Sequence, residues 1–216
     1  YGAVLKEGLY EDAERKEALL DLCRFTTNES EDPISLSQYL EKMPENQKDI
    51  YYISAETSAQ ALASPHLEGF KSKNVPVLIM TDAIDQFWLP MVGSFKEKKF
   101  TSITQGKINL DELDAKSKNK DKDKKENKEK QDKEFVDLIA QLKVVLGDQV
   151  KDIRLSSKLT DSPVCLVADE GDMDIAMEHL MAQRDSNYKG APRILEINGD
   201  HSLIKNMKSL LSKKNN

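Results

Sequence analysis

The sequence is poor in the residues that build many recognisable sites. Its 216 residues include two cysteines, three histidines and nine glycines. No apolar run approaches the roughly 18 residues of a membrane-spanning helix. The glycines are scattered and form neither a phosphate-binding loop nor a dinucleotide fingerprint, and no histidine has a partner at metal-ligand spacing. We therefore expect no membrane span, no disulfide framework and no metal or cofactor site within the chain.

Charge and cysteine placement also limit the possible partners. The net charge is −6, which argues against a nucleic-acid binder that relies on a basic surface. Cys23 lies in an apolar helical pattern and Cys165 in an apolar strand-like run, so we interpret both as small buried hydrophobic residues. Because free cysteines fit a reducing compartment, we expect a cytoplasmic protein that contacts neither nucleic acid nor membrane.

One segment differs in composition from the rest of the chain. Residues 111–134 contain 9 Lys and 9 Asp or Glu, so 18 of 24 positions are charged and the segment adds no net charge. Its only apolar members are Leu113 and Ala115. Because so little apolar area can offset the entropy lost on ordering, the segment is predicted to be disordered. It divides the chain into two folded parts.

The two folded parts have different patterns. Before the charged segment, strand patterns at 50–53 and 75–80 alternate with helical patterns at about 10–25 and 83–92, which predicts a small α/β/α unit with a parallel sheet. After it, helices and strands are mixed, and the expected fold is therefore α/β followed by α+β. The second part is predicted to have helices over 135–146, 172–184 and 202–211, and strands over 150–155, 163–168 and 193–197.

No catalytic constellation is visible. Four acidic residues within 169–174 resemble part of a calcium loop, but the glycine register and the distal glutamate are missing. Acidic residues gathered at a helix N-terminus, where the helix dipole favours them, are the simpler interpretation. No serine lies in a nucleophile elbow. We therefore expect no catalytic residue and no enzyme active site in this chain.

Two stripes of large apolar residues occur at helical spacing. A helix that is apolar on most sides is either buried or exposes a binding surface, and methionine is common on surfaces that accept many partners. Pro90 predicts a bend or break in the first stripe. A core role and an exposed role both remain open, although spacing alone favours the core. The first stripe comprises Ile84, Phe87, Trp88 and Met91, and the second comprises Met173, Met177 and Met181.

An ordered series of short segments resembles a known family. Before the charged segment these include LKEG at 5–8, LCRF at 22–25, IYY at 50–52, and Ser64-Pro65 with Leu67-Glu68 and Phe70. They look like the middle domain of the 90-kilodalton heat-shock chaperones. Beyond the charged segment, Arg154, LTDSP at 159–163, Met173 with Met177, and EIN at 196–198 are similar to the C-terminal domain of that family.

The series of matches is long, and the position of the charged segment identifies a branch. The matches run from about residue 2 to 206, and a charged segment between the middle and C-terminal parts is closer to the bacterial HtpG branch. One departure concerns the first apolar stripe. Gln86 and Phe87 occupy positions where an acid and a Trp are common in the family, and Trp88 is shifted by one.

The resemblance implies an ATP-driven, homodimeric chaperone. It implies that residues 1–105 are the distal part of the middle domain, 106–134 a charged flexible linker, and 135–216 a C-terminal domain that lacks most of the terminal dimerisation bundle. ATP and Mg²⁺ bind upstream of this region in the family. We therefore expect an excised fragment that neither binds ATP nor forms a stable dimer by itself.

The resemblance also implies a role for the two stripes. In the family, the junction of these domains carries an amphipathic surface for unfolded or partly folded client proteins, and a second copy of the chain and co-chaperones are further partners. The alternative is a purely structural segment that couples the ATPase to the dimer interface, and a buried Trp88 indole would favour it. The client-binding residues expected to lie together are Phe87, Trp88, Met91, Met173, Met177 and Met181.

Overall fold

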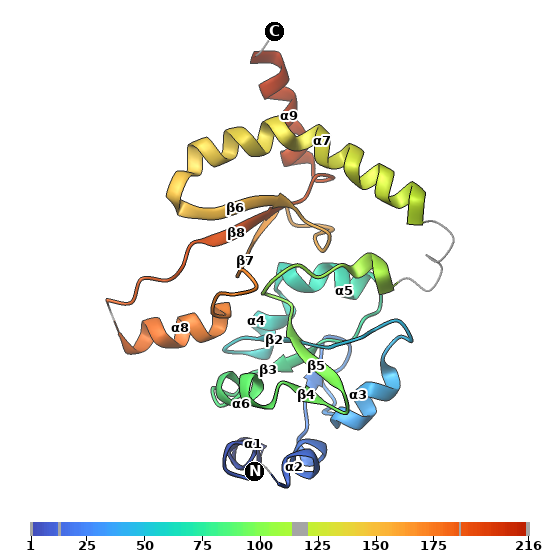
Figure 1. Ribbon diagram of the computed structural model, residues 1–216, viewed down its shortest axis with the longest axis vertical. Helices are drawn as coiled ribbons and strands as arrows, with labels where there is room; N and C mark the ends of the chain where they lie inside the picture. The colour runs from blue at the N-terminus through green and yellow to red at the C-terminus, as the bar shows by residue number, and fades with distance from the viewer. Residues whose placement is uncertain (1, 13, 114–120, 186, 215–216) are drawn as a thin grey trace.

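The computed structural model describes residues 2–12, 14–113, 121–185 and 187–214. Two folded units are stacked along the long axis of the molecule, and the two termini lie at its opposite ends (Figure 1). Each unit has its own sheet and its own hydrophobic clusters. This arrangement confirms the predicted class, an α/β unit followed by an α+β unit.

The sheet of the first unit has five strands in the order β1-β3-β2-β5-β4. The three central strands run parallel, as predicted, whereas the two-residue edge strands pair antiparallel to their neighbours. The sheet is therefore mixed. Its strands are β1 (Thr26–Thr27), β2 (Ile50–Ser54), β3 (Leu78–Met80), β4 (Ser94–Phe95) and β5 (Lys98–Ser102).

Successive residues of the central strands belong alternately to two hydrophobic clusters. On β3, Leu78 and Met80 join one cluster and Ile79 joins the other. Because successive strand side chains point to opposite faces, helices must cover both faces of this sheet. The first cluster is covered by α1 (Gly2–Glu11), α2 (Lys16–Leu22), α3 (Leu36–Lys42) and α6 (Asp85–Val92), and the second by α4 (Ser58–Leu62), the 3-10 helix η1 (Pro65–Leu67), α5 (Glu68–Ser72) and the 3-10 helix η2 (Leu110–Leu113).

The single helix predicted over about 10–25 is two helices. The Asp12 side chain accepts a hydrogen bond from the backbone N–H of Arg15 at 3.0 Å and pairs with its guanidinium. Such local side-chain bonds compete with helical backbone bonds, so α1 ends at Glu11 and α2 begins at Lys16.

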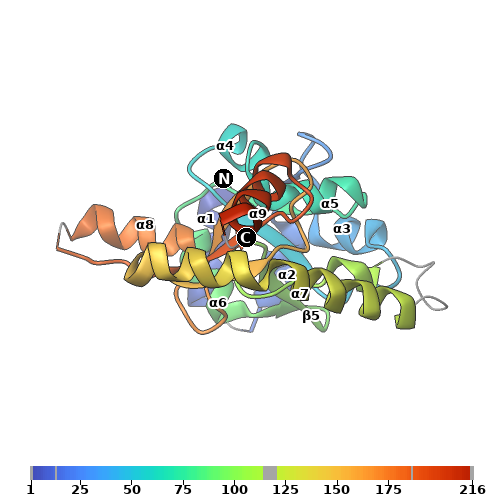
Figure 2. The ribbon, with the colours of Figure 1, turned by 90° about the horizontal axis from the view of Figure 1, so that it is seen from above.

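The second unit has a three-stranded sheet with helices packed on one face. β6 (Val150–Leu155) and β7 (Val164–Val167) flank β8 (Arg193–Ile197), parallel and antiparallel to it respectively. Residues of α7 (Asp121–Leu146) and α9 (Ser202–Lys214) form a hydrophobic cluster with this sheet, and the short 3-10 helix η4 (Gly147–Gln149) joins α7 to β6. Seen from above, α8 (Ile175–Arg184) lies to one side of this packing (Figure 2).

Both ends of the predicted linker, 106–134, are ordered in the structure. Ile108, Leu110 and Leu113 are buried in the second cluster of the first unit, so residues 106–113 pack against that unit and the prediction of a flexible linker is wrong for them. Residues 114–120 lie outside the described residues. The prediction of disorder is also contradicted from Asp121 on, where α7 begins. The later part of this helix packs on the second unit through Phe135 and Leu138.

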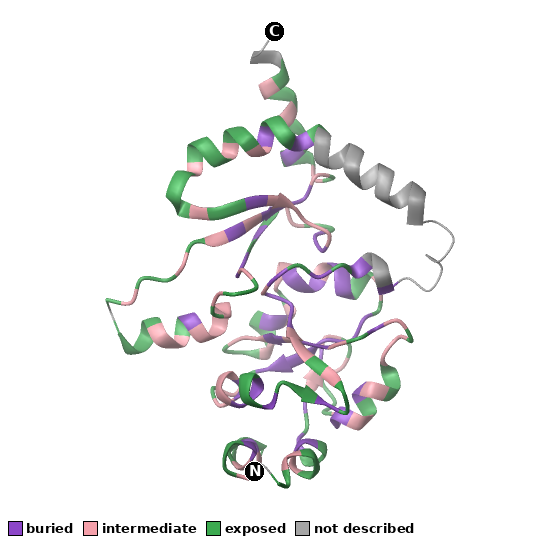
Figure 3. Cartoon of the chain, in the orientation of Figure 1, coloured by how far each residue is buried: buried purple, intermediate pink, exposed green. Residues whose placement is uncertain are grey.

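Burial follows the two sheets. Residues 75–80, which include β3, are the longest run of buried residues in the described part of the chain, and α8 is mostly exposed or half-buried (Figure 3). Cys23 and Cys165 are both free and buried, as predicted. Among the described residues, no helix is long and apolar enough to cross a membrane.

Candidate functional site

The Trp88 indole is in the core of the first unit. Its exposed fraction is 0%, and its Nε1 donates a hydrogen bond to Oδ1 of Asp85 at 2.7 Å. The ring packs edge-on against Phe100 with centroids 5.4 Å apart. This burial contradicts the prediction that Trp88 is part of an exposed client surface, because a fully buried and hydrogen-bonded indole cannot contact a partner.

The carboxylate that receives the Trp88 hydrogen bond is held by a buried cation. Lys6 Nζ on α1 lies 2.8 Å from Oδ1 of Asp85 and 2.8 Å from Oδ2 of Asp82. Burial raises the pKa of Asp85, and the charge of Lys6 only partly opposes this shift. Burial lowers the pKa of Lys6, but the two carboxylates more than offset this effect and its pKa is raised. The pair therefore fixes α1 to α6 next to Trp88.

The outer side of α6 carries Phe87 and Met91. Phe87 is half-buried, and Met91 has an exposed fraction of 53%. The one-residue shift noted in the sequence thus has a structural counterpart, because Trp88 turns into the core and Phe87 lies outside it. Pro90 does not break the helix, which continues to Val92 and ends at Gly93, whose φ of +69° suits a glycine.

The three methionines of the second stripe lie on or beside α8. Met173 precedes the helix and has an exposed fraction of 40%, whereas Met177 and Met181 are half-buried. The cleft between the first unit and α8 is lined by Gln86 of α6 but by none of the six predicted client-binding residues. The structure therefore does not join the two stripes across this cleft, because α8 turns a different set of side chains toward the first unit.

Main-chain pairing joins the two units directly. The N–H of Gly106 donates to the carbonyl of Ala168 at 2.8 Å, and the N–H of Ala168 donates to the carbonyl of Thr104 at 2.9 Å. These bonds form a parallel bridge between Gln105 and Ala168. The segment that follows β5 is thereby paired with the segment that follows β7.

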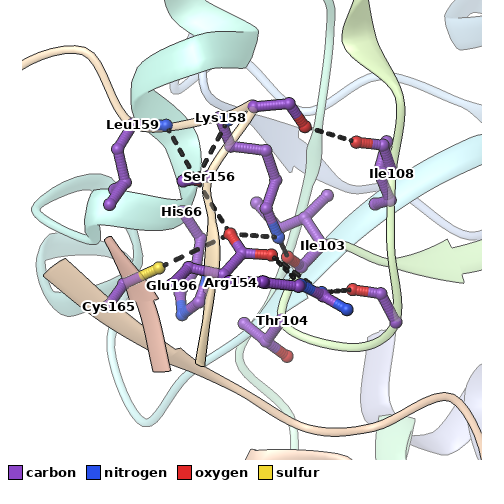
Figure 4. A network of polar contacts seen from close by, with 12 residues as sticks. His66, Ile103, Thr104, Ile108, Arg154, Ser156, Lys158, Leu159, Cys165 and Glu196 are labelled. Carbon is purple, nitrogen blue, oxygen red and sulfur yellow. Dashed lines mark hydrogen bonds and ion pairs between the residues drawn. The ribbon is translucent and has the colours of Figure 1, made fainter. Parts of the chain in front are cut away.

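A buried ionic network at this junction is centred on Glu196 of β8 (Figure 4). Its Oε1 accepts a hydrogen bond from Nη2 of Arg154 at 2.7 Å, and its Oε2 accepts one from Ser156 Oγ at 2.9 Å. Nζ of Lys158 lies 3.8 Å from Oε2. The same cations reach the first unit, because Lys158 donates to the carbonyl of Ile103 at 3.0 Å and Arg154 donates to that of Gly106 at 2.6 Å.

This network lies in a low-dielectric environment. Lys158 has an exposed fraction of 1%, and burial lowers its pKa although Glu196 opposes the shift. Burial and the charge of Glu196 raise the pKa of the neighbouring Cys165 thiol to about 12, so this cysteine is a thiol at neutral pH. Cys165 is therefore interpreted as a structural residue and not as a nucleophile.

Two further contacts tie the units together. Oδ2 of Asp174, the N-cap of α8, accepts hydrogen bonds from Ser102 Oγ at 2.5 Å and from Thr104 Oγ1 at 2.8 Å. Gln105 Nε2 donates to the carbonyl of Asp172 at 2.6 Å. The end of β5 is thus bonded to the start of α8, and the acidic cluster near this point caps the helix, as the sequence suggested.

The carboxylate of Glu68 at the start of α5 binds the loop before β7. It accepts hydrogen bonds from the backbone N–H groups of Thr160 and Asp161, both at 2.8 Å, and of Ser162 at 3.1 Å. Burial raises the pKa of Glu68, but these hydrogen bonds more than offset it and the pKa is lowered. A Cβ on the adjacent Gly69 would lie 2.6 Å from the carbonyl oxygen of Lys158, so this close approach requires glycine.

The sequence contained a signal for part of this junction. Glu68, the loop at 159–163, Arg154 and Glu196 all belong to segments that carry the family resemblance, but the resemblance assigned no role to them. The structure joins Glu68 to Thr160 across 92 positions of the chain and Arg154 to Glu196 across 42. Lys158 was missed, because a lysine that follows two serines in a loop has no local feature that marks it as buried.

His66 gives the junction a dependence on pH. Burial, followed by the charge of Lys158, lowers its pKa to about 4, while Glu196 and Asp174 oppose the shift. The imidazole pKa in an unfolded chain is about 6.5. Between pH 6.5 and 4 the unfolded state therefore binds more protons, and this group makes folding less favourable as the pH falls.

We expect His66→Gln to remove this pH dependence. From pH 7 to pH 4 the free energy of unfolding of the wild type should fall by about 3 kcal/mol more than that of the variant. Urea denaturation at both pH values measures the difference, in which the titration of other groups cancels. Replacement of the exposed His179 by Gln controls for loss of an imidazole. Parallel pH profiles of wild type and His66→Gln would contradict the expectation.

The comparisons with known proteins agree with this picture. Residues 1–216 match the family described as "Hsp90 protein". Chaperone protein HtpG of Roseobacter denitrificans is 43% identical over 204 residues, covering 94% of this chain and 32% of that protein. The HtpG proteins of Streptomyces coelicolor and Wolbachia pipientis are each 41% identical, covering 96% of this chain and 32% of their own length. The chain thus spans about a third of the curated relatives it matches. It belongs to the Hsp90 family.

Proposed function

We propose that this chain is the part of an ATP-dependent, homodimeric, cytoplasmic chaperone that couples the ATPase to the dimer interface. The observation that carries the proposal is the bonded junction: main-chain pairing at Gly106 and Ala168 and the buried Glu196 network join the two units directly. A rigid connection of this kind can transmit a rotation of one unit to the other.

ATP, Mg²⁺, the second copy and co-chaperones are proposed to bind the remaining parts of the protein. Among the described residues, no group of three His, Cys, Asp or Glu side chains is arranged to hold a metal ion. We further propose that the first domain extends to Leu113, since Leu110 and Leu113 are buried in its core.

A second candidate function is direct contact with partly folded clients. It is favoured by the exposure of Met91 and Met173 and the partial exposure of Phe87, which leave apolar side chains on the outside of both units. Flexible methionines and an aromatic ring can adapt to many sequences. In this proposal Trp88 packs in the core beneath the exposed residues of α6 and does not contact the client.

The coupling proposal predicts that Glu68→Ala loosens the junction, because three backbone N–H groups lose their acceptor. Spin labels on Lys42→Cys and Ser209→Cys, exposed sites in the two units, measure the interdomain distance while the native cysteines stay buried. We expect one narrow distance distribution in the parent and a broader one in Glu68→Ala.

The exposed Glu17→Ala is the matched control and should keep the narrow distribution. Identical distributions for the parent and Glu68→Ala would show that this contact does not hold the units together. A broad distribution in the parent itself would contradict rigid coupling as such.

A further inference from the structure

A cleft of about 590 Å³ lies between the first unit and α8. One wall is built at the carboxyl ends of β2 and β3, the position where open parallel sheets commonly bind ligands. The opposite wall is one face of α8. That face presents Ile175, Ala176, His179, Leu180 and Gln183.

Two buried polar atoms on residues of this cleft lack a hydrogen-bond partner in the described part of the chain. They are Ser54 Oγ and His66 Nδ1, and His66 is more than nine-tenths buried. The His66 ring is hydrogen-bonded to the backbone of Leu166, and since Nδ1 is unpartnered this bond belongs to the other ring nitrogen. With a pKa of about 4 the ring is neutral at neutral pH, so Nδ1 is a hydrogen-bond acceptor. A ligand that donates hydrogen bonds would satisfy both atoms.

The charged residues of the cleft are all acidic. Glu56 and Asp82 line it, and no Lys or Arg of the described residues does. Asp82 is paired with Lys6 at 2.8 Å. Glu56 has no cationic partner among the described residues and accepts one hydrogen bond from Gln183 Nε2, at 3.2 Å across the cleft. An incoming cation would therefore find an unneutralised carboxylate.

The rest of the lining has a large apolar share. Ile53 and Met80 contribute it from the strands, and Ile175 and Leu180 contribute it from α8. Such walls favour a ligand with an alkyl stem, because burial of apolar area is favourable at about 25 cal/mol per Å². Lysine and arginine side chains combine an alkyl stem with a cationic head.

We propose that this cleft binds a basic side chain of an extended peptide segment, with arginine preferred to lysine. Arginine has five N–H donors in a planar fork, which can serve the Glu56 carboxylate and neighbouring acceptors together. An apolar or acidic side chain would leave these acceptors without a donor, and a neutral donor would leave the Glu56 charge uncompensated. The site is distinct from Phe87, Met91 and Met173, none of which lines the cleft, and it does not depend on the coupling proposal.

Peptide binding to the full chain tests the proposal. The probe is the peptide acetyl-Leu-Arg-Leu-amide, and its partner replaces arginine by citrulline, which has nearly the same shape without the charge. By isothermal titration we expect saturable binding of the arginine peptide and about fivefold weaker binding of the citrulline peptide. Glu56→Gln should weaken the arginine peptide by the same factor and leave the citrulline peptide unchanged.

Two tryptophan variants on α8 locate the site. Ala176→Trp fills the cleft and should abolish binding, whereas Ala182→Trp, at an exposed position that does not line it, should bind as the parent does. Met91→Ser should also bind normally. Circular dichroism checks that each variant is folded. The absence of saturable binding, equal affinity for both peptides, indifference to Glu56→Gln, or a loss in Ala182→Trp or Met91→Ser would each overturn the proposal.

Discussion

Replacement of Glu196 by alanine is expected to lower the free energy of unfolding by about 3–5 kcal/mol, since removal of one partner of a buried ion pair leaves the other charge uncompensated. Lys158 is fully buried, and Glu196 is its nearest carboxylate at 3.8 Å. Arg154 loses two hydrogen bonds to the same carboxylate. Urea denaturation at pH 7 measures the change, with the exposed Glu45→Ala as the control, which should be within about 0.5 kcal/mol of the parent.

A double-mutant cycle shows whether the loss arises from the unpaired charge. Lys158→Met removes the buried cation and keeps a side chain of similar volume. When it is added to Glu196→Ala, no unpaired charge remains buried, so part of the lost stability should return. The combined variant is therefore expected to be more stable than Glu196→Ala alone. Additive losses would mean that the two side chains act independently, and the description of a coupled buried network would then be wrong.

The elements of both units were largely predictable because strand and helix periods are local. The runs at 50–53 and 75–80 are apolar and bounded by turn residues, and β2 and β3 lie within or next to them. The helix at 83–92 and the strand at 193–197 likewise match α6 and β8. The period of apolar residues indicates which face of a single helix or strand is buried. It therefore predicts the type of an element correctly where contacts with other elements do not change it.

The junction was not predictable in the same way. Glu68 binds backbone groups of Thr160 to Ser162, and Lys158 binds the carbonyl of Ile103. These contacts depend on how two units pack, which no pattern within one segment reports. A buried lysine in particular runs against composition, since lysine is almost never fully buried unless it is paired.

The assignment of Trp88 failed for a related reason. Ile84, Phe87, Trp88 and Met91 form a stripe, but Leu89 and Val92 make α6 apolar on nearly every side, so the pattern did not select one face. The contact that decides the orientation is the hydrogen bond from Trp88 to Asp85, itself held by Lys6 from α1. The contact between Lys6 and Asp85 spans 79 residues, so no pattern within one helix could predict it.

Trp88→Ala is expected to lower the free energy of unfolding by about 3–5 kcal/mol, as large-to-small substitutions of buried aromatic residues do. The change removes the contact with Phe100 and leaves the buried Asp85 carboxylate without one of its donors. Met91→Ser on the same helix is exposed and should change stability by about 0.5 kcal/mol or less. Denaturation midpoints of the two variants, compared with the parent, measure the contrast.

Trp88→Ala and Met91→Ser also distinguish a role in the core from a role in client binding. Both variants are made in the full-length protein, so that the avidity of a dimer is kept. Suppression of aggregation of a denatured substrate protein measures client capture. If the outer side of α6 contacts clients, Met91→Ser should weaken capture without loss of stability, because apolar contact area is lost. Trp88→Ala should weaken it only at temperatures where the variant unfolds. A stable Trp88→Ala with weakened capture would instead return the indole to the client surface and contradict the burial described above.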